Sequence, residues 1–181
     1  WAERAMVLPL NPSASKAKNK ATFNKRQNRF TLKEGDDLDQ YKGPFVQGRA
    51  FAITATVAPS GEKASGVIVA QGGTAMGYSV YLQNGELCFA VTNQSKRTVI
   101  RSGRNLTGKS NITVSLDKQA VVKLTVDGEE VKVAHVPGLI ASQPQDGVQV
   151  GLDEKGAVGD YEAPFAFEGS IEEVVIEIKK R

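Results

Sequence analysis

Residues 65–91 read SGVIVAQGGTAMGYSVYLQNGELCFAV, and this stretch decides the fold. Three short apolar segments, at 65–71, 77–82 and 86–91, are separated by a Gly-Gly pair at 72–73 and by Asn84-Gly85. An Asn-Gly pair is typical of a type I′ turn, because both central residues of that turn need positive φ. The stretch therefore predicts three consecutive antiparallel β-strands joined by tight turns.

The same pattern continues on both sides of this stretch. Residues 49–57 alternate Phe, Ile, Ala and Val with small or polar residues, as a half-buried antiparallel strand does. Asp127-Gly128 signals another hairpin. Segments 67–70 and 173–176 break the alternation, so we expect both to be covered on two faces. The predicted fold is all-β, a two-sheet antiparallel sandwich, with further strands at 29–32, 97–100, 111–116, 121–126, 131–135, 148–152 and 171–178.

Length and composition limit the kinds of protein that this chain can be. With 181 residues, 40% hydrophobic and 24% charged, the chain is long enough to bury one core. Its single cysteine, Cys88, excludes an internal disulfide and lies within a predicted strand, where it fits a buried apolar position. The only histidine is His135, so a catalytic thiol has little support. No apolar run approaches the ~18 residues of a membrane span, and no membrane partner is predicted.

The N-terminal part differs from the rest. Residues 1–7 are good helix formers, and Pro9 and Pro12 end any helix there. Basic residues then crowd a stretch rich in Ala, Asn and Ser. We interpret residues 1–26 as the end of a preceding domain and a basic linker, and residues 27–181 as the sandwich domain. An anion-binding strip is the alternative for the basic run, and no nucleic-acid partner is predicted. The basic residues are Lys16, Lys18, Lys20, Lys25, Arg26 and Arg29.

The segments at 66–73, 77–82, 85–89 and 124–128 resemble, in their order, the motifs of concanavalin A-like (laminin-G-like) jelly rolls. The tail, VGLD at 150–153 and DYEAPFAFEGSIEEV at 160–174, is similar to the C-terminal jelly-roll domain of large bacterial arylsulfatases, and residues 1–7 are similar to the last helix of such sulfatases. The resemblance implies a non-catalytic accessory domain in a secreted or periplasmic protein. Its partner would be the sulfatase catalytic domain of the same parent chain, on which it packs while assisting binding of a sulfated glycan.

Two other functions remain open, an independent lectin-like or adhesion module and a glycosidase. A sulfatase nucleophile lies in a Cys- or Ser-x-Pro-x-Arg segment, which residues 88–92 do not match. A glycosidase needs two carboxylates about 5–9 Å apart. Glu172, Glu173 and Glu177 on the last strand and the Asp37/Asp39 pair are the nearest candidates, and they lack flanking aromatic residues to stack on a sugar. The segment is therefore predicted not to be an enzyme.

Two kinds of ligand site are predicted. Laminin-G-like folds often hold Ca²⁺ at a rim of the sandwich, and a glycine-flanked loop here carries Asp153, Asp160 and Glu162, hard oxygen ligands that suit calcium. No other cofactor is assigned. A carbohydrate would need aromatic platforms, for which the candidates are Tyr78, Tyr81 and Tyr161. Because Tyr78 and Tyr81 are three residues apart in one strand, we expect them on opposite faces, where they cannot form one platform.

Overall fold

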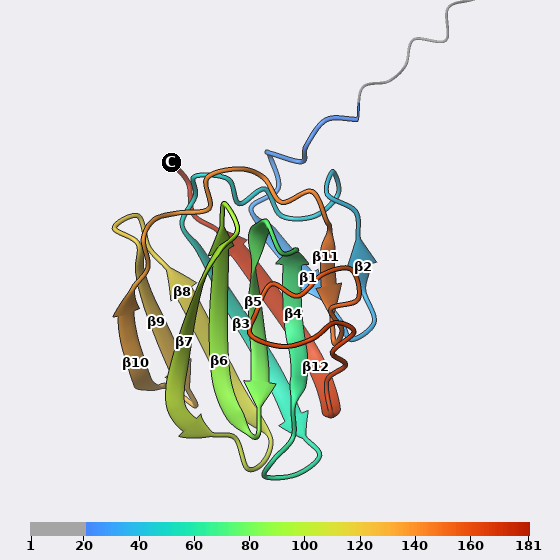
Figure 1. The fold of residues 1–181 in the computed structure, drawn as a ribbon, viewed down its shortest axis with the longest axis vertical. Coiled ribbons are helices and arrows are strands. Elements are labelled where there is room, and N and C mark those ends of the chain that lie inside the picture. Colours follow the sequence, from blue (N-terminus) through green and yellow to red (C-terminus); the bar gives the residue numbers. More distant parts are fainter. Residues whose placement is uncertain (1–20) are drawn as a thin grey trace, which may run out of the picture.

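The alternating segments form two six-stranded antiparallel sheets, packed face to face, in the computed structural model, which describes residues 21–181 (Figure 1). Sheet A has the order β1 (Arg29–Leu32), β12 (Gly169–Ile178), β3 (Phe51–Pro59), β8 (Ser110–Leu116), β9 (Val121–Val126) and β10 (Glu129–His135). Sheet B has the order β2 (Asp37–Leu38), β11 (Val148–Val150), β4 (Gly66–Gly72), β5 (Met76–Gln83), β6 (Glu86–Asn93) and β7 (Lys96–Asn105).

The predicted sandwich and its eleven strands are confirmed. The structure adds the two-residue strand β2 and lengthens β7 to ten residues. The proposed helical turns at 1–7 and half of the basic run (Lys16, Lys18 and Lys20) lie outside the described residues. At the start of the described part, the Phe23 ring packs against the rings of Tyr41 and Phe45, with centroids 5.1 and 5.6 Å away. Among residues 21–181, no helix is long and apolar enough to cross a membrane.

The hairpin turns follow the predicted chemistry. Asn84 and Gly85 have φ of 50° and 84°, and Asp127 and Gly128 have φ of 48° and 83°, as type I′ turns require. A third hairpin, between β6 and β7, turns at Gln94 (φ 51°) and the following serine (φ 61°). The sequence gives no signal there, because neither residue is among those that commonly adopt positive φ.

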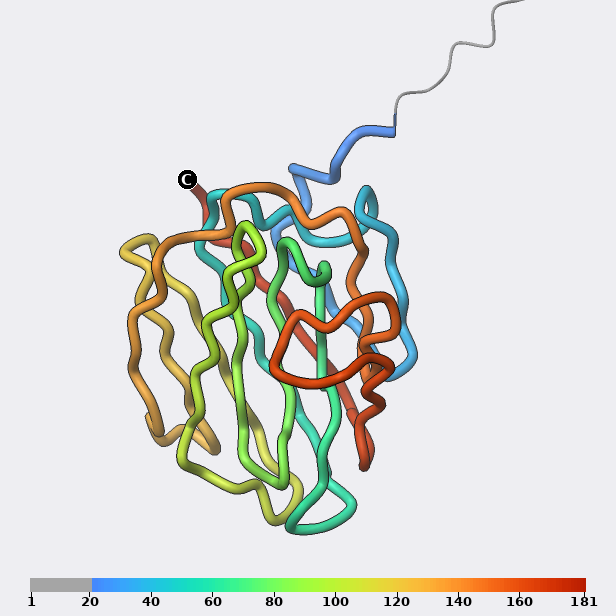
Figure 2. The backbone as a smooth tube through the Cα atoms, in the orientation of Figure 1, coloured from blue at the N-terminus to red at the C-terminus, as the bar shows by residue number. Residues whose placement is uncertain are grey.

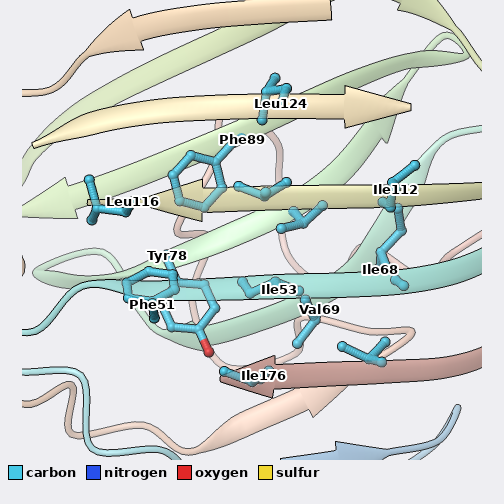
Figure 3. Close-up of a cluster of buried hydrophobic side chains, with 14 of the residues drawn as sticks. Phe51, Ile53, Ile68, Val69, Tyr78, Phe89, Ile112, Leu116, Leu124 and Ile176 are labelled. Atoms are coloured by element: carbon cyan, nitrogen blue, oxygen red, sulfur yellow. The ribbon is translucent and has the colours of Figure 1, made fainter. Parts of the chain in front are cut away.

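The main core lies between the two sheets. Figure 3 shows side chains from both sheets interdigitating, with Phe51 of β3 against Tyr78 of β5 at a ring-centroid distance of 4.8 Å. Alternate residues of β3 are buried, as the period-two pattern predicts for a strand with one face on the core. The largest fully buried side chains include Phe89, Ile112 and Leu124.

The outer faces of the two sheets differ. All seven residues of β4 are buried, which confirms the prediction that 67–70 is covered on both faces. The same prediction for 173–176 is wrong, because Val174 and Ile176 point into the core while Glu173 is exposed. The outer face of β12 is open to solvent, and a β-bulge between Ile171 and Glu173 disturbs the sequence alternation there.

Residues 151–168, the connection from β11 to β12, cover the outer face of sheet B. In Figure 2 this segment crosses in front of β4 and β5. Backbone hydrogen bonds hold it to β4 near both ends, from Val67 N to Phe165 O (3.1 Å) and from Gly151 N to Ile68 O (2.9 Å). Beneath it lies a second, smaller core of Val67, Ala70, Tyr81, Cys88 and Ala90, against which Val99, Tyr161 and Phe165 pack. This segment is called the covering loop below.

Candidate functional site

A polar latch fixes the covering loop to sheet B. The Tyr161 hydroxyl donates to Asp153 Oδ2 (2.5 Å) and also lies 2.9 Å from Ser79 Oγ of β5. Val158 N donates to the same carboxylate oxygen at 3.3 Å. Asp153 is only 2% exposed, and this burial raises the pKa of its carboxyl group; burial likewise raises the pKa of Tyr161. In this latch the carboxyl group of Asp153 is buried, and only a few hydrogen-bond donors stabilise its ionised form.

Aromatic rings accompany the latch. Tyr161 meets Tyr81 edge to face at 4.9 Å and stacks on Phe165 at 4.8 Å. Gly159 permits this packing, because a Cβ atom there would lie 2.4 Å from Cε1 of Tyr161 and 2.7 Å from Cε1 of Tyr81. Tyr78 lies in the core on the other side of β5, as expected from its spacing. The structure therefore brings together two of the three predicted tyrosines, and of these Tyr81 is fully buried.

The three carboxylates proposed for calcium do not gather. Asp153 is buried in the latch, whereas Asp160 and Glu162 are exposed. Asp160 Oδ1 lies 4.0 Å from Nη1 of Arg97, and no group of three or more acidic, histidine or cysteine side chains in residues 21–181 is placed to hold a metal ion. Calcium binding by this trio stays a prediction, which the geometry does not favour.

β7 places two arginines on the outer face of sheet B. Arg97, Val99 and Arg101 alternate with inward-facing residues, so their side chains share that face. Arg97 holds the covering loop, donating from Nε to Val158 O (3.0 Å) and from Nη2 to Ala157 O (3.1 Å). Its position is therefore structural.

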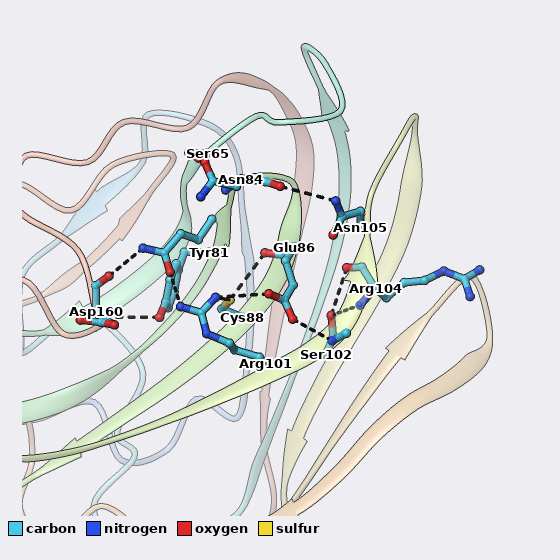
Figure 4. A network of polar contacts seen from close by, with 12 residues as sticks. Ser65, Tyr81, Asn84, Glu86, Cys88, Arg101, Ser102, Arg104, Asn105 and Asp160 are labelled. Carbon is cyan, nitrogen blue, oxygen red and sulfur yellow. Dashed lines mark hydrogen bonds and ion pairs between the residues drawn. The ribbon is translucent and has the colours of Figure 1, made fainter.

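Arg101 lies beyond the covering loop, in a cluster of polar side chains drawn in Figure 4. Its Nη1 donates to Glu86 Oε2 (3.2 Å) and contacts Cys88 Sγ (3.7 Å), and its Nη2 donates to Gln83 Oε1 (2.6 Å). Gln83 in turn donates to Asp160 O, and Glu86 accepts from Gly103 N. We call Gln83, Glu86 and Arg101, with the adjoining Asp160, the Arg101 cluster.

The cluster combines fixed geometry with access to solvent. The Arg101 side chain is 46% exposed and that of Glu86 is 23% exposed. A guanidinium group carries five N–H donors, and the contacts within the described residues use three of them. The Nε–H and one Nη2 hydrogen are left for a ligand oxygen. Pre-oriented donors of this kind suit a hydroxyl or a carboxylate group.

The arrangement offers no catalytic chemistry that we can identify in residues 21–181. Burial raises the pKa of Cys88 to about 11, so the thiol stays protonated and is a poor nucleophile at neutral pH. Among the carboxylates considered for a glycosidase, Glu172 pairs with Lys109 at 2.7 Å and Glu177 pairs with Arg29 on the solvent face of sheet A. Oδ1 of Asp39 accepts backbone hydrogen bonds from Tyr41 N and Lys42 N in a turn.

The sequence does not predict the Arg101 cluster. The predicted strand ends at residue 100, whereas β7 continues to Asn105 and includes Arg101. One signal is present, because Arg97 and Arg101 lie four residues apart in a strand, which places their side chains on the same face. Nothing in the sequence, however, pairs Arg101 with Glu86 across the long hairpin between β6 and β7.

No protein-family model matches the sequence, and no curated protein matches it. Solved structures match the fold. The CBM40 of the Ruminococcus gnavus IT-sialidase, bound to α2,3-sialyllactose, superposes with a TM-score of 0.61 at 17% identity, over 83% of this chain and 89% of that one. The leech intramolecular trans-sialidase matches at 0.57 and 13%, over 83% of this chain and 25% of that one. Mouse laminin α1 domains LG4-5 match at 0.56 and 14%, over 88% and 41%.

These likenesses show the fold. None of the three structures is an arylsulfatase, so the sulfatase parentage predicted from residues 150–174 is not shown by them. The chain has a two-sheet jelly-roll fold of the concanavalin A-like/laminin-G-like type, which resembles the folds of the IT-sialidase CBM40 and of laminin α1 LG4-5.

Proposed function

We propose that this domain is a non-catalytic glycan-binding module whose ligand lies on the outer face of sheet B, at the Arg101 cluster. One observation carries the proposal: a half-exposed guanidinium group, held by Glu86 and Gln83, keeps two donors free at the edge of the covering loop. Fixed polar groups of this kind orient the ligand in small-molecule sites. The lectin-like alternative from the sequence thus becomes the main interpretation.

A sugar that carries a carboxylate is the first ligand to test. Free N–H donors of an arginine can bind the oxygens of a carboxylate, and such charge-assisted pairs are stronger than neutral ones. The CBM40 structures of similar fold are described as bound to α2,3- and α2,6-sialyllactose, whose sialic acid has such a group. Glu86 and Asp160 supply acceptors for sugar hydroxyl groups in the same cluster.

Isothermal titration with 3′-sialyllactose, 6′-sialyllactose and lactose tests the proposal. We expect the wild-type domain to bind a sialylated sugar more tightly than lactose. Arg101→Ala should weaken that binding at least about tenfold, since a charge-assisted pair contributes roughly 1.5–3 kcal/mol. Lys123→Ala is the matched control, because Lys123 is also half-exposed and paired with a glutamate, Glu130, but lies on sheet A. Equal binding by wild-type and Arg101→Ala domains would refute the site.

The finer prediction, an accessory domain of an arylsulfatase, is a separate proposal. It rests on the sequence resemblance of residues 150–174, and with it goes the expected secreted or periplasmic location. A docking face for a catalytic domain would be expected to expose apolar side chains. In residues 21–181 the only large hydrophobic side chain that is exposed is Val133, at 46%. The coding sequence upstream of this segment tests the proposal: a sulfatase domain there would support it, and a different domain would exclude it.

A further inference from the structure

β7 is the outermost strand of sheet B, and one of its two backbone edges has no partner strand (Figure 1). Its register with β6 is unbroken from Lys96 to Arg101. The other outermost strands are shorter or less regular: β1 has four residues, β2 has two, and a β-bulge interrupts β10 between Glu130 and Lys132. Short strands and bulges disfavour pairing with a further strand. Among residues 21–181, β7 therefore offers the longest regular edge.

The hydrogen-bonding pattern shows which groups of this edge are free. The tight turn between β6 and β7 makes Asn93 and Lys96 a hydrogen-bonded pair, and in an antiparallel ladder such pairs alternate with non-hydrogen-bonded ones. Arg97, Val99 and Arg101 consequently direct their N–H and C=O groups away from β6. No backbone hydrogen bond outside the β6–β7 ladder uses these groups in the described part of the chain. Three evenly spaced donor–acceptor pairs are thus available to an added strand.

A cavity of about 250 Å³ lies beside the start of β7. Its walls come from inward-facing residues of β6 and β7 and from the segment that follows β10. Two hydrogen bonds hold that segment, from Asn93 Nδ2 to Leu139 O (2.8 Å) and from Ala141 N to Asn93 Oδ1 (3.1 Å). Where a peptide adds a strand to a sheet, pockets for alternate side chains supply the specificity. The lining of this cavity includes Val91, Thr98, Pro137 and Gly138.

The cationic side chains around this edge are only partly neutralised. Arg97 and Arg101 each have one acidic neighbour. Lys96, in the wall of the cavity, has no ion-pair partner within residues 21–181, and neither has Lys132 on β10, the neighbouring strand of sheet A. The edge therefore carries an excess of positive charge, which favours an acidic partner.

We propose that β7 is a docking edge for an extended acidic peptide, which adds an antiparallel seventh strand to sheet B. The backbone of the peptide pairs with Arg97, Val99 and Arg101. Two acidic side chains, four residues apart, stand opposite the two arginines on the outer side of the sheet. The apolar side chains between them point inward, toward the cavity. The inference goes beyond the proposed function and does not rest on it, because it depends on the backbone edge of β7 rather than on sugar binding.

A second copy of the domain fits this edge poorly. Antiparallel pairing of β7 with its own copy about Val99 would set Arg97 opposite Arg101. Like charges directly opposite each other destabilise a strand pair. A peptide with acidic residues at these positions replaces this repulsion by attraction.

Isothermal titration with an end-blocked peptide, Ser-Glu-Leu-Thr-Val-Glu-Ser, tests the inference. In the predicted register the threonine N–H points toward β7 and the leucine N–H points away from it. N-methylation of the threonine should therefore weaken binding about tenfold, because it removes a ladder hydrogen bond and obstructs the approach of the strands. N-methylation of the leucine is the matched control and should change binding by less than about twofold. Lysine in place of both glutamates should weaken binding about tenfold or more.

Variants of the domain test the same edge from the other side. Val99→Pro removes an outward N–H and none from the ladder with β6, a position at which an edge strand tolerates proline; it should weaken binding about tenfold. Ala141→Trp fills the cavity from an exposed position and should have a similar effect, about tenfold, even if Val99→Pro fails to fold. Lys96→Glu should weaken binding about threefold. Lys63→Glu, in the exposed loop between β3 and β4, controls for net charge.

Four outcomes would overturn the inference. The peptide could fail to bind at millimolar concentration, which would leave the cations as protection against strand pairing. The two N-methylated peptides could bind alike, which would exclude strand addition. The lysine peptide could bind as tightly as the glutamate peptide. Sedimentation could show a dimer of the domain that Val99→Pro abolishes, which would assign the edge to a second copy. None of these results depends on whether sialyllactose binds.

Discussion

Replacing Tyr161 by phenylalanine isolates the latch that holds the covering loop. Phenylalanine keeps the ring packing with Tyr81 and Phe165 and removes only the hydroxyl group. That hydroxyl group is the 2.5 Å donor to Asp153, which is 2% exposed and would keep the 3.3 Å bond from Val158 N. Loss of a hydrogen bond to a buried charged group costs about 1.5–3 kcal/mol. We therefore expect Tyr161→Phe to lower the free energy of unfolding at pH 7.5 by about 2 kcal/mol.

The cost should depend on pH. Burial raises the pKa of Asp153 in the folded protein, so the folded state holds this proton more tightly than the unfolded chain does. The resulting stability is present at low pH and is lost as pH rises through the folded-state pKa. The Tyr161 hydrogen bond lowers that pKa, and without it the ionised carboxyl group is still less favourable. The variant should thus lose more stability than the wild type between pH 4.5 and pH 7.5.

Urea unfolding at both pH values measures this difference. For a domain of this size, 2 kcal/mol corresponds to a fall in Tm of about 4–8 °C. Tyr41→Phe is a matched control, because the described residues give the Tyr41 hydroxyl group no hydrogen-bond partner, and we expect it to change stability by less than about 0.5 kcal/mol. A Tyr161→Phe domain as stable as the wild type at pH 7.5, or with an equal loss at both pH values, would refute the latch.

The other predictions follow from single residues. Tyr78→Phe should raise stability by up to about 1 kcal/mol in urea unfolding, because the Tyr78 hydroxyl group is buried without a partner in the described part; a loss would mean that it has one. Gly159→Ala should lower Tm by several degrees, since its Cβ meets two tyrosine rings; an unchanged Tm would show that they move freely. Cys88, with a pKa raised to about 11, should react with Ellman's reagent at pH 8 only after unfolding, and rapid reaction of the native domain would contradict its burial. The calcium site predicted from the sequence at Asp153, Asp160 and Glu162 is tested by adding excess calcium: a rise in Tm that chelator reverses would support it, and an unchanged Tm would exclude it.

Period-two alternation and turn chemistry were enough to predict the sandwich. The Asn84-Gly85 and Asp127-Gly128 turns and the alternating strand β3 each depend on local sequence, and each is confirmed. The prediction for 173–176 failed because an apolar run shows only that side chains can be buried. Which face is covered depends on distant parts of the chain, here the covering loop on sheet B and nothing equivalent on the outer face of β12.

The candidate site was predicted only in part, for the same reason. The sequence predicts a ligand site in the loop at 153–162, and Tyr81 and Tyr161 do meet there. The carboxylates of this loop predict an exposed ion site, because the sequence does not show that Asp153 is buried. Arg101 gained significance only from cross-strand register, which pairs it with Cys88 and brings Glu86 within reach. Register depends on packing across the whole sheet, so spacing along the chain did not reveal it.

Mapping of amide chemical shifts during titration with 3′-sialyllactose tests the central claim most directly. The account predicts saturable shifts concentrated on Gln83, Glu86, Arg101 and Gly103 and on the covering loop near Asp160, with the outer face of sheet A unaffected. Shifts confined to sheet A would contradict a glycan site on the outer face of sheet B, as would the absence of any shift at millimolar sugar.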